Sequence, residues 1–178
     1  MKLRTADLES HLGKGLQPVY LVTGDEPLLV DEALTAIREA ARRAGFSERE
    51  VLDADSGFDW GQLHASSMSM SLFAERRLIE LRFSTARVGQ NGARAITEYC
   101  QQPPEDVLLL INGGRLEARQ RSAAWAKAVD AAGAVVQAWP VSPRQLPEWV
   151  AGRMRAAGLQ PSSEATALAV RSLSPVIM

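Results

Sequence analysis

The sequence is poor in the residues from which disulfide frameworks, metal centres and membrane spans are built. It contains one cysteine, Cys100, and two histidines, so an internal disulfide is excluded and a Cys/His metal centre lacks ligands. We expect Cys100 to be a small buried hydrophobic residue in a reducing compartment, and we predict neither a metal nor a cofactor. No apolar run reaches the roughly 18 residues of a transmembrane helix. These absences favour a cytoplasmic protein without membrane contact.

The sequence also lacks an excess of basic residues. Its formal net charge is −1 and its pI about 6.2, whereas a protein that mainly coats nucleic acid is usually basic. A local DNA-binding patch is still compatible with these values. Hydrophobic residues make up 46% of the 178 residues, which is ample for a folded core. The length predicts one large domain, or one domain and part of another.

Short apolar runs alternate with helical patterns along the first 140 residues. Strands are expected at 19–23, 50–54, 77–83, 107–111 and 134–138, with helices at 3–12 and between the strands. Five such alternations predict an α/β fold with an open, mostly parallel five-stranded sheet flanked by helices. The run VLLLI should be a central strand, because it is apolar on both faces. Residues 77–83 alternate instead, which predicts a strand with one partly wet face.

The composition changes near residue 141, where Pro140, Pro143 and Pro147 cluster. Only two helical stretches follow, at 146–157 and 163–173. We therefore expect an α/β domain over 1–140 and part of a small helical domain over 141–178. Two helices bury little apolar surface and the sequence stops at an apolar end, so we expect a fragment of a longer protein.

Residues 18–44 form the pattern of a strand, a glycine turn and a helix, on which P-loop proteins bind a nucleotide. A working P-loop reads GxxxxGK[ST], with backbone N–H groups and a lysine facing the phosphates. The turn here consists of Gly24, Asp25, Glu26 and Pro27. Carboxylates replace the phosphate cradle, no lysine follows, and proline has no N–H to donate. We predict a degenerate nucleotide site, in which both carboxylates cap the helix.

A second ATPase signal is missing as well. The expected central strand at 107–111 is followed by Asn-Gly-Gly, where an ATPase would place a carboxylate to hold Mg²⁺. The sequence also lacks GxSxG, HExxH and CxxC motifs. The chain is therefore predicted to bind rather than to catalyse.

One segment stands out positively: residues 66–77, SSMSMSLFAERR, alternate serine with methionine and lead into a Leu-Phe pair. Methionine is common at adaptable binding surfaces, and a few apolar residues carry most of the energy of an interface. Leu72 and Phe73 are therefore candidate anchors for a partner. The pattern by itself favours the plainer interpretation, in which both side chains pack beneath the sheet.

Four segments occur in an order and spacing that resemble the delta-subunit family of bacterial DNA polymerase III clamp loaders. They are GDEPLLVDEA, FDWGQL, MSLFAERRLIELR and AWPVSPRQLPEWVAGRMRAAGL, and the resemblance extends from about residue 16 to about residue 170. It implies an AAA+-like α/β domain without a working ATP site, a helical lid domain and a C-terminal collar domain. The collar is missing here, and the tail SLSPVIM departs from the family pattern.

The resemblance also implies a function. In the family the Met-Ser-Leu-Phe segment binds the sliding clamp, so Leu72 and Phe73 would enter a hydrophobic pocket and Met70 and Ser71 would flank them. The subunit would open the clamp for loading onto primed DNA during replication, without hydrolysing ATP itself. Nucleotidyltransferase activity would belong to the polymerase complex. The implied partners are the clamp (beta subunit), the other clamp-loader subunits and primer-template DNA.

Two alternatives from other classes remain open. One is a P-loop-like nucleotide-binding enzyme with an unusual site, motivated by the strand–glycine–helix pattern. The other is a direct DNA-binding module, with Arg76, Arg77 and Arg82 as candidate contacts. For the isolated chain, a solvated basic face is the more ordinary interpretation of these arginines.

Overall fold

The computed structural model describes residues 1–69, 75–83 and 88–173. The chain divides into two compact units, Met1–Trp139 and Pro140–Met178. In the part of the chain that is described, no helix is both long enough and apolar enough to span a membrane.

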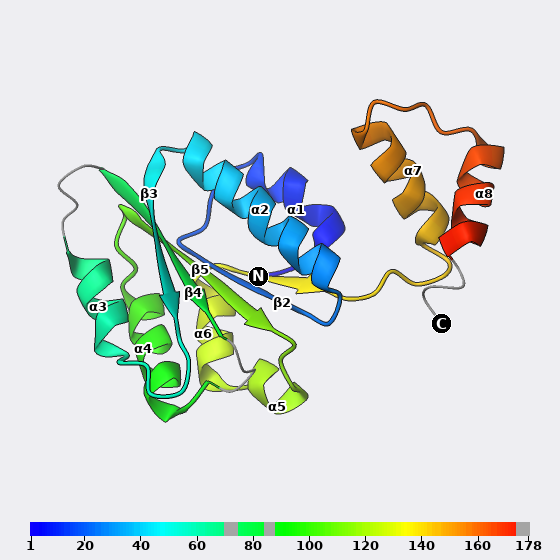
Figure 1. Cartoon of the computed structure of the whole chain (residues 1–178). Coiled ribbons are helices and arrows are strands. Elements are labelled where there is room, and N and C mark those ends of the chain that lie inside the picture. The colour runs from blue at the N-terminus through cyan, green and yellow to red at the C-terminus, as the bar shows by residue number, and fades with distance from the viewer. Residues whose placement is uncertain (70–74, 84–87, 174–178) are drawn as a thin grey trace. The chain divides into compact units, whose positions relative to one another are not determined.

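The first unit is a parallel sheet whose strands are connected by helices (Figure 1). In chain order its elements are β1 (Lys2–Arg4), α1 (Thr5–Leu12), β2 (Val19–Gly24), α2 (Pro27–Arg43), β3 (Phe46–Asp53), α3 (Gly61–Met68), β4 (Arg76–Arg82), α4 (Gln90–Gln101), β5 (Val107–Gly114), α5 (Ala118–Arg121), α6 (Ala124–Ala132) and β6 (Ala134–Ala138). The strand order is β1-β6-β2-β5-β4-β3, and all neighbours run parallel. The α/β class and the parallel sheet that the alternation predicts are confirmed.

The sheet has one strand more than the five predicted. The sequence pattern assigns Leu3 and Arg4 to the first helix, but both belong to β1, which pairs with β6, Leu3 opposite Val136. Three residues with a single buried side chain are too few to show a period of two. The helix expected over 116–132 likewise divides into α5 and α6.

Two hydrophobic cores form because the central strands are apolar on both faces. On one face, helices α1 and α2 cover the sheet, and Ile37 packs with Tyr20 and Leu110 (Figure 1). On the other face, α3, α4 and α6 cover it, and Ile96 and Trp125 pack in the second core. Each large apolar side chain buried in this way contributes roughly 1.5–3 kcal/mol. This doubly covered sheet holds the ends of its strands in fixed positions.

Cys100 lies in the second core and is buried, as the sequence predicts. Burial raises the pKa of its thiol to about 12, because the thiolate would lose its hydration. The residue therefore behaves as a packing side chain.

Close approach of the backbone around β2 requires two glycines. A Cβ at Gly24 would lie 2.0 Å from the carbonyl oxygen of Ala138, and one at Gly133 would lie 2.0 Å from that of Val19. Both distances are far inside van der Waals contact, so any side chain would push the strands apart.

The second unit contains α7 (Leu146–Ala156) and α8 (Ser163–Leu173), which pack against each other. Pro147 stands in the first turn of α7, where its missing N–H costs nothing. The Oγ of Ser162 accepts the backbone N–H of Ala165 at 3.1 Å and so caps α8. The two helical stretches expected from the sequence are thus present.

Candidate functional site

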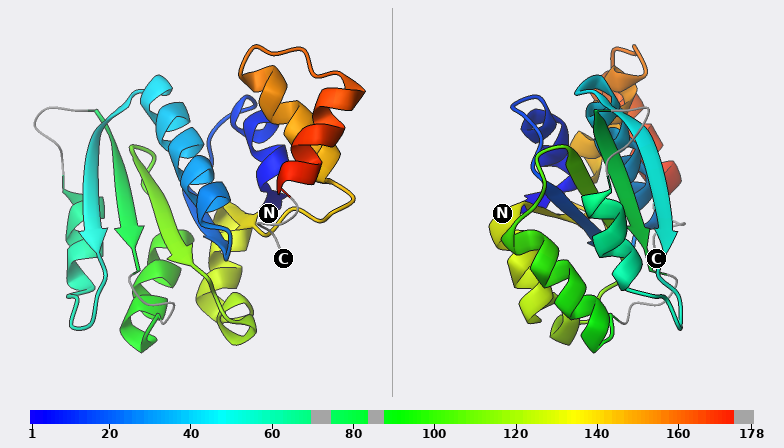
Figure 2. Two further views of the ribbon diagram at one scale, coloured as in Figure 1. Left: turned by 45° about the vertical axis from the view of Figure 1, so that its right-hand side comes forward. Right: turned by 90° about the vertical axis from the view of Figure 1, so that its left-hand side faces the viewer.

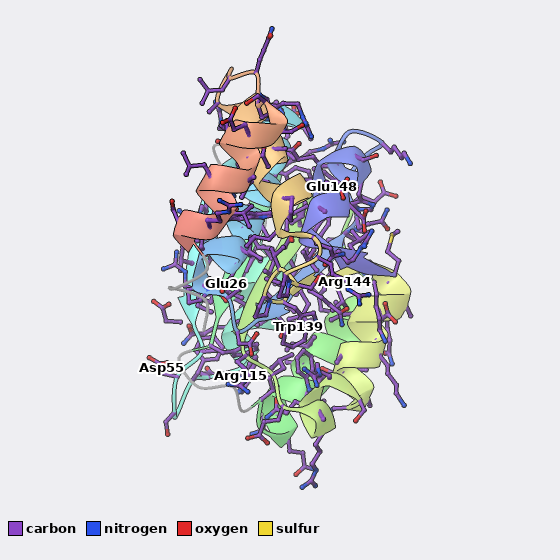
Figure 3. All side chains as sticks on the ribbon, turned by 90° about the vertical axis from the view of Figure 1, so that its right-hand side faces the viewer. Glu26, Asp55, Arg115, Trp139, Arg144 and Glu148 are labelled. Atoms are coloured by element: carbon purple, nitrogen blue, oxygen red, sulfur yellow. The ribbon has the colours of Figure 1, made fainter. Side chains whose placement is uncertain are left out.

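The four residues of the predicted nucleotide site lie where β2 passes into α2. Gly24 ends the strand, Glu26 is the N-cap of the helix, and Pro27 is its first residue. Glu26 makes no side-chain cap hydrogen bond, so the capping role predicted for it is wrong. Asp25 instead faces Arg115, with 3.8 Å between Oδ2 and Nε. Figure 3 labels Glu26 and Arg115 in a view onto this part of the molecule.

An open cavity of about 540 Å³ borders this turn. It is lined by Gly24, Asp25, Pro27, Val30, Asp31, Leu34, Asn112, Gly114 and Arg115. The positive end of the α2 dipole would favour an anion here, but the carboxylates of Asp25 and Asp31 also line the cavity, and Arg115 is the one cation among its described lining residues. Among residues 1–69, 75–83 and 88–173, no cluster of three or more His, Cys, Asp or Glu could hold a metal ion.

The four residues predicted to contact a clamp, Met70, Ser71, Leu72 and Phe73, lie outside the described residues. The structure does describe both ends of their segment: α3 precedes it and β4 follows it. Figure 2 shows α3 beside the edge of the sheet formed by β3 and β4. Met68, the last residue of α3, is 66% exposed. Sequence reasoning did not select Met68, although its place in the Ser-Met alternation was an available signal.

Arg77 is buried and faces α3 instead of solvent. Its side chain is only 8% exposed. Nη1 donates to Oγ of Ser69 at 3.0 Å, and Nη2 donates to the carbonyl oxygens of Ser66, at 2.6 Å, and of Ser69. Glu50 of β3 lies 3.8 Å from Nη1 and accepts a hydrogen bond from Oγ of Ser66 at 2.8 Å. These contacts join β3, α3 and β4 directly before and after the 70–74 segment.

The other two candidate DNA contacts lie at the surface. Arg76 is exposed, and its guanidinium stands 5.6 Å from the centre of the Phe46 ring. The side chain of Arg82 is 40% exposed and donates through Nε to Glu80 at 2.8 Å. Arg76 and Arg82 are therefore accessible to solvent, whereas the side chain of Arg77 is hardly accessible.

Glu80 is the centre of an arginine cluster. Its carboxylate is fully buried and accepts hydrogen bonds from Arg38 at 2.8 and 3.0 Å, from Arg49 at 2.9 Å, and from Arg82. Burial would raise the pKa of Glu80, but the hydrogen bonds from the arginines outweigh that effect and lower it to about 2. The wet strand face predicted at this position is wrong for Glu80, because partners from α2 and β3 cover it.

Comparison with known proteins shows which family the chain resembles. The family model described as DNA polymerase III, delta subunit, matches residues 20–138. The chain is 32% identical to DNA polymerase III subunit delta of Escherichia coli K12 over 165 residues, which are 90% of this chain and 47% of that protein. It is 30% identical to the Haemophilus influenzae protein of the same name over 164 residues, 89% of this chain and 46% of that protein.

A solved structure of the Bacillus subtilis DNA clamp loader delta protein has the same fold. It superposes with a TM-score of 0.70 at 19% identity, over 91% of this chain and 50% of that one. This chain spans about half the length of the relatives it matches. With most of its first unit covered by the family model, the chain belongs to the DNA polymerase III delta subunit family.

Proposed function

We propose that this chain binds and opens the sliding clamp as part of a clamp loader, without hydrolysing ATP itself. The observation that carries the proposal is the match of residues 20–138 to the delta subunit family, within which the Met-Ser-Leu-Phe segment falls. Because the chain spans about half of its relatives, the proposal concerns the clamp-binding part of the subunit. We interpret Met1–Trp139 as the AAA+-like domain and Pro140–Met178 as part of the lid.

In this proposal Leu72 and Phe73 are the anchors that enter a pocket on the clamp, and Met70 and Ser71 are flanking contacts. Met68 supports it, because a methionine that is 66% exposed directly before the segment extends the apolar surface available to a partner. The two-sided core behind β4 and β5 supplies a rigid base for the contact.

Clamp binding should depend on the two anchors. Replacing Leu72 and Phe73 with alanine is expected to weaken binding to the cognate sliding clamp at least about tenfold, because burying both side chains contributes about 3–6 kcal/mol before entropy costs. Surface plasmon resonance on immobilised clamp measures the change. Leu168→Ala on α8 is the control, since Leu168 is also 66% exposed. Unchanged binding by the folded double variant would refute the anchors, and no binding by the intact chain would refute the proposal.

We also propose that the β2–α2 turn does not bind ATP. Asp25 and Asp31 bring negative charge to the cavity where phosphates would lie, and Pro27 removes a backbone donor. The competing nucleotide-binding function rests on the strand–glycine–helix arrangement and on one cation, Arg115.

Calorimetric titration with millimolar Mg-ATP is therefore expected to show no binding. Binding that Arg115→Ala removes would favour the nucleotide-binding alternative instead. A Gly24 substitution is unsuitable for this purpose, because its Cβ would collide with the backbone of Ala138 and disturb the sheet.

The remaining partners belong to the assembled complex in this proposal. Primer-template DNA would meet the surface arginines Arg76 and Arg82, while Arg77 is too deeply buried to reach a phosphate. The other clamp-loader subunits would bind through the part of the relatives' length that this chain does not span. We propose a cytoplasmic location, as replication of bacterial chromosomal DNA requires.

A further inference from the structure

We propose that Arg77 is a positioning residue for clamp binding, which ties the end of α3 to the start of β4. It thereby fixes the two points between which residues 70–74 run. This inference rests on the proposed function, and it assigns to Arg77 a task other than contact with DNA.

The hydrogen bonds of Arg77 reach the end of α3. The last carbonyl groups of a helix lack partners within the helix and form the negative end of its dipole. The guanidinium of Arg77 supplies both a positive charge and donors there, to the carbonyl oxygens of Ser66 and Ser69 and to Oγ of Ser69. The backbone N–H of Arg77 donates to the carbonyl oxygen of Asp106 at 2.8 Å, just before β5. One residue thus links α3 to the middle of the sheet.

Glu50 completes this link from β3. Its Oε1 accepts from Oγ of Ser66 at 2.8 Å, and its Oε2 lies 3.8 Å from Nη1 of Arg77. Mutual contacts therefore join Glu50, Ser66 and Arg77, and they connect two neighbouring strands to the helix. A displacement of Ser66 would have to break contacts to both strands.

Filling space at this position does not by itself require an arginine. Burial of a guanidinium is costly, and Nε of Arg77 has no hydrogen-bond partner among the described residues. A methionine would fill a similar volume, but it would leave the carbonyl oxygens of Ser66 and Ser69 without this donor. Clamp binding, in contrast, would benefit from the arginine, because ordered ends at Ser69 and β4 lose less entropy when a partner binds.

The test compares Arg77→Met, Arg77→Lys and Glu50→Ala in the full chain. Arg94→Met is the matched control, because Arg94 is 79% exposed and pairs with Glu98 on the surface of α4. Three quantities are measured: the Kd for the sliding clamp, the amide hydrogen exchange of residues 67–69, and the thermal midpoint.

We expect Arg77→Met to bind the clamp about tenfold or more weakly and to exchange the amides of residues 67–69 about tenfold faster, while its thermal midpoint stays above the temperature of the binding measurement. Arg77→Lys should lie between, since lysine keeps the charge but lacks the planar fork whose two nitrogens reach Oγ of Ser69 and both carbonyl groups. Glu50→Ala should weaken binding in the same direction. Arg94→Met should match the unsubstituted chain.

Wild-type clamp affinity in Arg77→Met would overturn the inference, as would faster exchange without weaker binding, which would mark a purely structural role. If Arg77→Met does not fold, the clamp affinity and amide exchange of Arg77→Lys and Glu50→Ala test the inference by the same criteria. Loss of binding in Leu72→Ala/Phe73→Ala together with full binding in all three variants overturns only this inference. Absence of clamp binding by the unsubstituted chain overturns the proposed function and this inference with it.

Discussion

Replacing Glu80 with glutamine is expected to lower the free energy of unfolding by about 3 kcal/mol at pH 7. The buried carboxylate accepts hydrogen bonds from Arg38, Arg49 and Arg82, and its removal leaves three guanidinium groups without their common counter-charge. Loss of one partner from a buried ion pair costs about 3–5 kcal/mol. We expect the lower end, because the arginines are 24–42% exposed and can turn toward water. Urea unfolding followed by circular dichroism measures the difference.

Glu98→Gln is the matched control for this measurement. Glu98 pairs with Arg94 at 2.7 Å, but both side chains are more than half exposed, so the pair contributes less than about 1 kcal/mol. A Glu80→Gln variant as stable as the control would show that the arginine cluster contributes little to the fold.

The lowered pKa of Glu80 implies that the stability of the fold depends on pH. The pKa of Glu80 falls from 4.5 to about 2 on folding, so its contribution is fully present above about pH 4.5. As the pH decreases toward 2, the unfolded chain takes up the proton first and the contribution is lost. The gap in unfolding free energy between the unsubstituted chain and Glu80→Gln should therefore narrow between pH 7 and pH 3. A gap that stays constant over this range would contradict the assignment.

Replacing Gly133 with alanine is expected to destabilise the first unit by about 3 kcal/mol, at the upper end of overpacking costs. The added Cβ would lie 2.0 Å from the carbonyl oxygen of Val19, the first residue of β2. That neighbour is backbone in the middle of the sheet and cannot rotate away, so β6 and β2 would have to separate. The midpoint of urea unfolding, with an unchanged slope, gives the cost.

Gly13→Ala tests whether this effect comes from close approach or from the loss of a glycine. Gly13 has a φ of −66°, and a Cβ there would have its nearest neighbour at 3.5 Å, an ordinary contact. We expect its unfolding free energy to change by less than about 0.5 kcal/mol. Equal losses in both variants would argue against the packing explanation.

The parts of the fold that the sequence predicts are those with long apolar patterns. VLLLI and VYLV are buried on both faces, and they appear as β5 and β2 in the middle of the sheet. The three residues of β1 were missed because their pairing with β6 is a long-range property that no local pattern encodes. The predicted capping of α2 by Asp25 failed for a similar reason. Its carboxylate faces Arg115, which lies about ninety residues further along the chain.

The charged residues of β4 show a further limit of sequence reasoning. Arg77 and Glu80 have the appearance of a solvated face in the sequence, yet both are buried. Their partners come from α2, α3 and β3, so their environment depends on which elements the fold brings together. That Leu72 and Phe73 contact a clamp remains a prediction from the resemblance, and the clamp-binding experiment tests it.

The buried thiol of Cys100 makes this chain convenient for site-specific fluorescent labelling. Maleimides react with thiolate, and a pKa raised to about 12 leaves almost none of it at neutral pH. A cysteine introduced in place of Met68, the exposed last residue of α3, would therefore take up a dye while the native thiol stays unreacted. If the proposed function holds, a dye at that position reports clamp binding in real time, and the protein keeps its natural core.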